Sequence, residues 1–343
     1  MKLKDYLKIK KVTNKTFANL LNVSPVSLSR YLNGDRLPEK EILIKIYNLT
    51  EGFVSPNDFC LEGEKKYEVN QNNKEELKKF HHRILSGSRK YLGKAITLIE
   101  SSREKDQITS ERLLELFKGN DKSIRIGITG VPGVGKSTFI ESFGIKLIQK
   151  GFKVAVLAVD PSSRFSGGSI LGDKTRMEKL SVNKNAFIRP SPSSGHLGGV
   201  AKRTSESILC LEEAGFDIIF VETMGVGQAE TEVYDMVDIF LVLLLPAGGD
   251  ELQGIKKGII EMADLIIVNK ADGELKKSAE ITQREYKNAI HIINKSRINE
   301  DISVVVCSSL NQTGFENVWS YILKFVNIRK KNNDFMNERN SQK

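Results

Sequence analysis

The sequence predicts an α/β protein whose mostly parallel sheet has helices on both faces, preceded by a small all-α unit and a helical extension. Three observations predict this. Short runs of Val, Ile and Leu alternate with longer helical patterns between residues 124 and 325. These runs are almost continuously apolar, which is typical of parallel strands that are buried on both faces. A chain of 343 residues also has room for two or three domains.

Turn-forming residues and changes in amino-acid composition divide the chain into five parts. Residues 1–63 form a compact helical unit, and residues 64–80 read as a linker because they are polar, charged and poor in apolar side chains. Residues 81–120 are a helical extension, with helices expected over 81–101 and 109–118. Residues 121–326 are the α/β domain, and residues 327–343 are a basic tail. The expected strands are 124–128, 153–159, 187–189, 217–221, 239–245, 265–268 and 303–306.

The composition bounds the class of protein. No apolar run approaches the ~18 to 20 residues that cross a bilayer, and the N-terminus lacks the apolar core of a secretory signal, so we expect a soluble, cytoplasmic protein without membrane contact. The cysteines Cys60, Cys210 and Cys307 lie far apart and are expected to be reduced core thiols. The pair His81 and His82 lies on a basic segment without carboxylates or cysteines nearby, so we do not expect it to bind a metal.

The net charge of +9 indicates either a polyanionic partner or only a lysine-rich composition. The positions of the excess basic residues help to decide between these two explanations. Residues 1–60 hold ten Lys or Arg against six Asp or Glu, and the tail from Lys324 onward is also basic. Nucleic acid is therefore a candidate partner for the N-terminal unit.

The stretch from Gly130 to Thr138 follows the first expected strand and precedes a helical pattern, which is the setting of a phosphate-binding loop. Its glycines let backbone N–H groups surround phosphate oxygens, and the positive end of the following helix favours the same charge. Lys136 supplies a charge for the β and γ phosphates, and Ser137 a hydroxyl for Mg²⁺. The predicted loop consists of Gly130, Val131, Pro132, Gly133, Val134, Gly135, Lys136, Ser137 and Thr138. The chain is predicted to bind a nucleoside triphosphate.

A second motif predicts which base the bound nucleotide carries. The strand expected at 265–268 ends in Asn269-Lys-Ala-Asp272. A carboxylate at Asp272 can accept from both N1–H and the amino group of guanine, which adenine does not offer. A site that pairs such groups rejects the base lacking them by ~10⁴-fold. Asn269 and Lys270 are expected to brace the loop and cover the plane of the base.

Carboxylates follow several of the expected strands. Asp160 ends the strand at 153–159, and Asp173 lies in a glycine-rich loop after it. Both can approach Mg²⁺ or its waters. Glu222 follows the strand at 217–221, at the position where phosphate-binding enzymes of this type usually carry Asp, and the N–H of Gly225 can sense the γ-phosphate. Together these residues predict a magnesium site at one edge of the sheet.

From about residue 83 to residue 325 the sequence resembles the MeaB/ArgK family of P-loop GTPases, to which the methylmalonic aciduria type A proteins belong. The sequence segments that carry the resemblance are long and specific. It comprises Asp160-Pro-Ser-Ser, Gly167-Gly-Ser-Ile-Leu-Gly-Asp-Lys-Thr-Arg-Met177, Ile188-Arg-Pro-Ser-Pro-Ser-Ser-Gly195, Leu197-Gly-Gly-Val200, Val221-Glu-Thr, Gly225-Val-Gly-Gln228, Asp250-Glu-Leu-Gln-Gly-Ile-Lys-Lys-Gly258 and Asn269-Lys-Ala-Asp272.

The resemblance implies a GTPase with GTP or GDP and Mg²⁺ as ligands. It implies service as a chaperone to an adenosylcobalamin-dependent acyl-CoA mutase of the methylmalonyl-CoA mutase type, with GTP gating cofactor loading and protection. Intrinsic turnover is expected to be slow and partner-stimulated, since no arginine finger is evident in the sequence. An older alternative, a kinase acting on transport binding proteins, lacks a catalytic-loop signature.

By position, the resemblance assigns roles to further residues. Asp160, Asp173 and Glu222 surround the metal, and Lys256 closes a switch loop that reports to the mutase. Gln228 orients water or merely ties down its loop, and both readings stay open. Ser308, Ser309 and Leu310 fall in the last guanine-contact loop.

Three departures from the family pattern stand out. Met224 and Ala247 replace the more usual Val and Gly, which leaves the expected ligands intact. The family usually continues past its final helix with a long arm used in homodimerisation, whereas this sequence reaches Lys343 soon after residues 319–326. The resemblance therefore leaves a homodimer open. The third departure is the N-terminal unit.

Residues 3–38 resemble a Cro/repressor-type helix-turn-helix. Phe17, Ala18 and Leu21 would pack its first helix, Asn22 and Val23 would make the turn, and Val26 with Leu28–Leu32 would seat the second helix. The recognition helix would present Ser24, Ser27, Ser29 and Arg30 to DNA. A retained three-helix bundle that no longer reads DNA is the alternative.

Two other function classes stay open beside the mutase chaperone. One is a nucleotide-gated DNA-binding regulator, in which the GTPase switches the N-terminal unit. The other is a metallochaperone GTPase of the nickel-delivery type. The latter normally needs a His-rich or Cys-bearing metal site, which this sequence does not show.

Overall fold

The computed structural model describes residues 3–10, 12–33, 36, 38–50, 53–54, 74–119, 122–160, 177–192, 197–223, 225, 229–246, 257–293, 302–332, 335, 339 and 342. The chain divides into two compact units, residues 1–69 and residues 70–343. Each is described by itself. None of the described helices is long and apolar enough to cross a membrane.

The first unit is all-helical, as predicted. Its described helices are α1 (Leu3–Ile9), α2 (Asn14–Leu21), α3 (Pro25–Asn33) and α4 (Lys40–Leu49). They pack around a core that includes Phe17, Ala18, Leu21, Leu28 and Ile46, each no more than 2% exposed. This apolar cluster holds the four helices together.

A tight turn joins α2 to α3. Asn22 takes the left-handed conformation, with φ 59°, and its N–H caps α2, a role for which Asn is suited. Val26 differs from the prediction, because it is 62% exposed while Leu28 and Tyr31 are buried. Val26 lies three and four residues before Ser29 and Arg30 and so shares their outer face of the helix.

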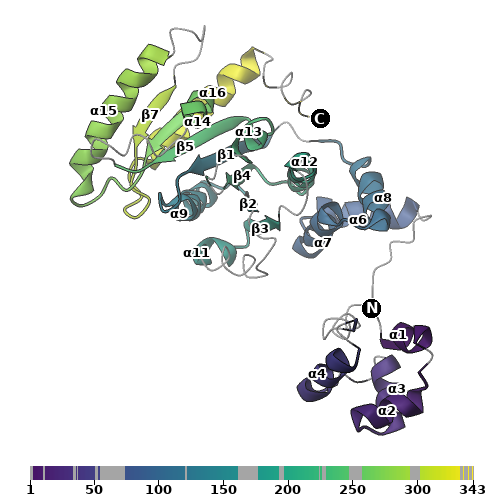
Figure 1. The fold of residues 1–343 in the computed structure, drawn as a ribbon. Coiled ribbons are helices and arrows are strands. Elements are labelled where there is room, and N and C mark those ends of the chain that lie inside the picture. The colour runs from purple at the N-terminus through teal and green to yellow at the C-terminus, as the bar shows by residue number, and fades with distance from the viewer. Residues whose placement is uncertain are drawn as a thin grey trace. The chain divides into compact units, whose positions relative to one another are not determined.

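The second unit contains a seven-stranded parallel sheet with the order β3-β2-β4-β1-β5-β6-β7 (Figure 1). All seven predicted strands are present and all neighbouring pairs are parallel. The strands are β1 (Ile124–Gly130), β2 (Val154–Asp160), β3 (Ala186–Pro192), β4 (Ile218–Thr223), β5 (Ile239–Leu244), β6 (Leu265–Val268) and β7 (Ser303–Val306). The predicted α/β class is confirmed.

Helices cover both faces of this sheet (Figure 1). On one face α9 (Lys136–Gln149), α11 (Glu178–Ser181) and α16 (Phe315–Lys331) share an apolar core with the strands. Right-handed crossovers place α12 (Leu197–Glu213), α13 (Ala229–Tyr234), α14 (Lys257–Met262) and α15 (Leu275–Ile293) on the other. The core is rich in aromatic rings, and Phe143 lies within 6.4 Å of the rings of Phe139, Phe315 and Trp319.

An aspartate placed just before a strand recurs along the sheet and fixes the strand register. Asp217 accepts a hydrogen bond from the N–H of Lys153, Asp238 from that of Arg125, and Asp264 from that of Phe240, each at 2.7 Å. The backbone N–H of each aspartate donates in return to the carbonyl of the same partner. Each aspartate thus closes the start of one strand against its neighbour.

The helical extension has three helices rather than the two predicted: α6 (Lys74–Leu85), α7 (Arg89–Glu100) and α8 (Glu104–Leu114). The predicted helix over 81–101 was wrong because Gly87, with φ 75°, ends α6. Thr109 lies inside α8 and does not begin a helix. At the other end, α16 continues to Lys331 and so passes through the domain boundary expected at residue 326.

The extension is tied to the edge of the sheet. α7 contacts both α12 and β3, and Arg189 on β3 pairs with Glu100 at the end of α7. His81 on α6 lies 2.7 Å from a carboxylate oxygen of Glu213. The carboxylate neighbour of His81, which the local sequence does not show, is supplied by α12.

Candidate nucleotide-binding site

The carboxyl ends of β1, β4 and β6 bring the sequence motifs together at one edge of the sheet. In open parallel sheets this is the edge at which ligands bind. The phosphate loop connects β1 to α9, Glu222 lies near the end of β4, and Asn269 follows β6 directly. The sheet thereby joins segments that lie more than a hundred residues apart in the sequence.

Lys136 lies within the phosphate loop. Its ammonium group donates to the carbonyl oxygen of Gly130 at 2.8 Å and to that of Val131 at 3.3 Å. The residue is 9% exposed, so its charge is held at the centre of the loop, where a phosphate group would meet it. Within the loop Val134 is fully buried, while Pro132, Gly133 and Thr138 are exposed.

Ser137 and Glu222 lie in contact. The Ser137 hydroxyl donates to a carboxylate oxygen of Glu222 at 3.1 Å, and Glu222 is 8% exposed. Asp160 ends β2, which pairs with β4 so that Ala158 lies opposite Glu222. Hydroxyl and carboxylate oxygens are the hard ligands that Mg²⁺ prefers. The residues of this edge therefore suit a magnesium ion beside the phosphate loop.

The end of β4 also contacts the end of β1. The hydroxyl of Thr223 donates to that of Thr129 at 2.8 Å, and both residues are buried. Gly225 follows with φ 78°, and a Cβ at this position would come within 2.1 Å of the carbonyl oxygen of Gly130. Only glycine allows this close approach. The threonine pair was not predicted, since either residue alone reads as an ordinary strand residue.

The guanine motif is tied to the phosphate loop through Asn269. Its side-chain amide donates to the carbonyl oxygen of Val134 at 2.9 Å, and its side-chain oxygen accepts from both the N–H and the hydroxyl of Ser309, at 3.1 and 2.7 Å. Asn269 is 1% exposed and Ser309 4%. One side chain thus links three loops.

The carboxylate of Asp272 is held by Ser308, whose hydroxyl donates to it. Ser308 is fully buried, and its hydroxyl also accepts from the N–H of Asn311. Lys270 is exposed and has φ 58°, and Leu310 is 76% exposed. Asp272 is therefore oriented by the loop that follows β7.

The structure does not describe the side chains of some predicted site residues. Asp173, Gln228 and Lys256 lie outside the described residues, and for Asp160 only the backbone is described. In the first unit Ser24, Ser29 and Arg30 are exposed, and Ser27 is half-buried. The Ser24 hydroxyl accepts from the N–H of Ser27 at 3.1 Å, so Ser24 also caps α3.

The two described cysteines are both buried: Cys210 lies in α12, and Cys307 directly follows β7 and precedes Ser308. Burial raises the pKa of the Cys307 thiol from 9.0 to about 12, and burial also raises the pKa of Cys210, helped by the nearby charge of Glu213. Because the thiolate is the reactive form of cysteine, we expect both thiols to react slowly while the chain is folded.

The fold and the site define a P-loop GTPase. A family model described as "Methylmalonyl Co-A mutase-associated GTPase MeaB" matches residues 92–343. The chain belongs to this MeaB family. A separate model described as "Helix-turn-helix" matches residues 3–49, which are the four helices of the first unit.

Relatives and a solved structure agree with this assignment. A Caulobacter vibrioides protein is 54% identical over 258 residues, 75% of this chain and 79% of its own length. GTPase ArgK of Escherichia coli is 50% identical over 246 residues, 71% of this chain and 74% of its own. A crystal structure titled "LAO/AO transport system kinase" is 38% identical, with a TM-score of 0.67 over 79% of this chain and 81% of that one.

Proposed function

We propose that this chain binds GTP with Mg²⁺ and, through GTP hydrolysis, gates cofactor loading and protection of an adenosylcobalamin-dependent acyl-CoA mutase of the methylmalonyl-CoA mutase type. The family description, which names a mutase-associated GTPase, supports the partner. The contact of Ser137 with Glu222 supports the switch, because both groups belong to the metal environment that a γ-phosphate would complete.

In this proposal each group has a separate task. Lys136 exchanges its contacts with the loop carbonyls for phosphate oxygens. Mg²⁺, held by Ser137 with Asp160, Asp173 and Glu222 nearby, would neutralise phosphate charge. Asp272 pairs with guanine, with Asn269, Lys270 and the residues Ser308, Ser309 and Leu310 shaping the base pocket. Gln228 and Lys256 keep the roles that the family resemblance implies.

The test is the rate of GTP hydrolysis by the full chain, measured alone and with a purified methylmalonyl-CoA mutase. We expect slow turnover alone and a clear rise with the mutase, since a partner that meets the γ-phosphate charge raises such rates by up to ~10³–10⁵-fold. Lys136→Ala is the control and should show no rise. An unchanged rate with adenosylcobalamin-dependent acyl-CoA mutases of this type would contradict the proposed partner.

We infer a second function, DNA binding by the first unit. The outer face of α3 supports it, because Ser29 and Arg30 are exposed there beside the helix-turn-helix turn. A nucleotide-gated regulator would bind DNA differently with GTP and with GDP. The metallochaperone alternative finds no such support, since the described residues contain no group of three or more His, Cys, Asp or Glu side chains that could hold a metal ion.

DNA binding is tested with the full chain and double-stranded DNA at several salt concentrations. Each phosphate contact contributes ~0.9 to the slope of log K against log salt. Arg30→Ala should therefore lower the slope by ~0.9, while Arg36→Ala, which removes an exposed arginine paired with Glu39, should change it less. Equal slopes for Arg30→Ala and the unmodified chain would show that this face does not touch DNA.

A further inference from the structure

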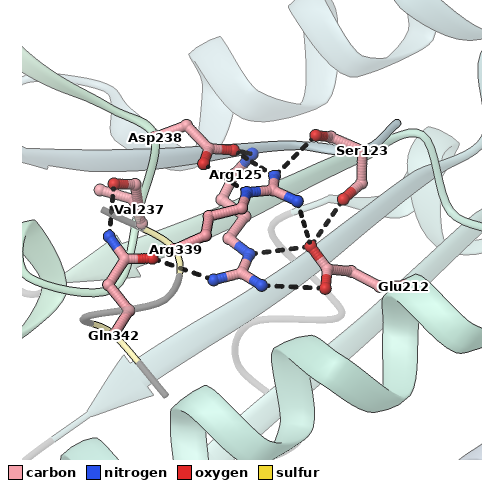
Figure 2. Close-up of polar contacts among 7 residues, drawn as sticks. All are labelled: Ser123, Arg125, Glu212, Val237, Asp238, Arg339 and Gln342. Carbon is pink, nitrogen blue, oxygen red and sulfur yellow. Dashed lines mark hydrogen bonds and ion pairs between the residues drawn. The ribbon is translucent and has the colours of Figure 1, made fainter. Parts of the chain in front are cut away.

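A buried cluster of charged side chains lies near the amino ends of β1 and β5, at the edge of the sheet opposite the nucleotide site. Figure 2 shows its polar contacts. It contains Arg125 in β1, Glu212 at the end of α12, Asp238 just before β5, and Arg339, which follows α16. Each is 5% exposed or less. Arg125 and Gly130, where the phosphate loop begins, are separated by about 17 Å, since five strand residues at about 3.3 Å each span this length.

The cluster consists of two arginine–carboxylate pairs. Arg125 donates from Nε and Nη2 to the two carboxylate oxygens of Glu212, at 2.8 and 2.9 Å. Arg339 donates in the same way to Asp238, at 2.8 and 2.6 Å. Such two-point contacts match the planar guanidinium group. The pairs are also joined, because Arg339 Nη1 lies 3.4 Å from Glu212 (Figure 2).

Three members of the cluster belong to the α/β domain, but Arg339 comes from the segment after α16. Two more residues of that segment lie beside it. The Arg339 guanidinium lies 4.3 Å from the ring centroid of Phe335, which is 3% exposed. Gln342 accepts from Arg125 at 3.1 Å and donates to the carbonyl of Val237 at 3.3 Å.

We propose that residues 335–342 are a docking peptide, and that Ser123, Arg125, Glu212 and Asp238 form a binding site for its arginine. We call these four residues the acidic seat. Ser123 completes the seat, because its hydroxyl donates to Glu212 at 2.6 Å and its carbonyl accepts from Arg339 at 2.8 Å. The class of ligand is a peptide segment that carries an arginine behind an aromatic residue.

The charges explain why the seat needs this ligand. With Arg339 bound, two guanidinium groups face two carboxylates. Without it, Arg125 is the only cation of the described residues that contacts Glu212 and Asp238, which leaves one negative charge uncompensated among side chains that are nearly fully buried. An uncompensated buried charge is strongly unfavourable. An empty seat therefore binds an arginine side chain from a separate peptide as well.

Because residues 335–342 are covalently connected to the domain that carries the acidic seat, the affinity of the free peptide for the seat can be estimated. A short covalent connection between two binding partners gives an effective concentration of about 1 mM. If the tethered segment occupies the seat more than about nine tenths of the time, the free peptide binds with a Kd of about 100 µM or tighter. The interaction is thus measurable between separate molecules.

The experiment uses a chain ending at Asn332 and a fluorescent peptide of residues 333–343. We expect the peptide to bind with a Kd of about 100 µM or tighter. Arg339→Ala in the peptide should weaken binding about 100-fold, because it leaves the Asp238 carboxylate unpaired. Arg339→Lys should restore only part of the affinity, since an ammonium group keeps the charge but cannot make the planar two-point contact of a guanidinium group. Gln342→Ala, which removes two hydrogen bonds but no charge, is the milder control.

The shortened chain is first checked by circular dichroism and thermal melting. If it is native and no peptide binding is seen up to 1 mM, the proposal is wrong. If it does not fold, hydrogen exchange of the full chain decides instead. Asp238→Asn keeps an acceptor for the N–H of Arg125 but removes the charge that Arg339 meets, so it should speed exchange of residues 335–342.

Asp264→Asn is the matched control for this exchange measurement, because Asp264 has the same backbone role before β6. Equal exchange of residues 335–342 in the two variants would overturn the proposal. A full-length dimer that separates into monomers upon Arg339→Ala would overturn the placement of the segment in its own chain, and would show instead that it docks on a second copy.

Discussion

The side chain of Asn269 donates to the backbone carbonyl of Val134, 135 residues earlier in the sequence, at 2.9 Å. This contact places the guanine loop against the phosphate loop. A Cβ at Gly135 would come within 2.9 Å of the same amide nitrogen, so Gly135 provides the space that Asn269 occupies. The base pocket and the phosphate pocket are therefore held as one unit.

Asn269→Ala should weaken binding of GDP and GTP about 10- to 100-fold, because buried partners such as the carbonyl of Val134 and the hydroxyl of Ser309 lose their hydrogen bonds. Titration with a fluorescent guanine nucleotide measures this. Gln283→Ala is the matched control, since Gln283 donates a side-chain amide to the carbonyl of Val304, outside the nucleotide edge. Equal affinities for the two variants would contradict the tethering role.

Asp272→Asn should shift nucleotide preference from guanine toward xanthine, because the amide NH₂ can donate to the 2-oxo group of xanthine, where the carboxylate accepts from the 2-amino group of guanine. Competition of GTP and XTP for the same site measures the preference within one protein sample. The hydroxyl of Ser308, which contacts Asp272 in the structure, can still bond to the amide oxygen. A variant that still prefers GTP would show that Asp272 does not read the base.

Gly225→Ala should disturb the contact between the end of β4 and the phosphate loop, because the added Cβ would meet the Gly130 carbonyl. We expect weaker binding of the triphosphate together with a loss of stability. Gly151→Ala is the control: its φ is also positive, at 97°, but nothing lies within 4 Å of an added Cβ. It should cost only about 1 kcal/mol of unfolding free energy, from backbone conformation alone. Urea unfolding and nucleotide titration separate the two effects.

Thr13 and Ser24 occupy equivalent positions before α2 and α3. Each hydroxyl accepts from the N–H three residues later, at 3.2 and 3.1 Å. Replacement of either by Ala should lower the stability of the first unit by about 1 kcal/mol, measured by hydrogen exchange in the full chain. If Ser24→Ala also weakens DNA binding while Thr13→Ala does not, Ser24 contacts DNA in addition to capping α3.

The buried thiols predict a dependence on pH. Because folding raises the pKa of Cys307 from 9.0 to about 12, its contribution to stability is complete below pH 9 and is lost as the pH rises toward 12. A Cys60→Ser chain, which retains Cys210 and Cys307, should react with a thiol-specific dye only after denaturation. Rapid reaction of both thiols at pH 8 in the folded chain would contradict their burial.

The sequence determined the sheet and the nucleotide edge. Strand composition fixes which segments are buried on both faces, and the phosphate loop and the Asn269–Asp272 motif each act through residues close together in the chain. All of these signals are local. For the same reason the right-handed crossovers and the parallel pairing followed from the order of strands and helices.

Tertiary structure alone decided the contacts between distant segments. Local periodicity joined α6 to α7 and assigned Val26 to a core, but Gly87 and the packing of α3 decided otherwise. The sequence predicted residues 327–343 only as a basic tail, and the structure shows that Arg339 is buried between Glu212 and Asp238. A buried charge is stable only beside a partner. The partner of Arg339 lies about a hundred residues earlier in the sequence. No local sequence pattern predicts a contact over that separation.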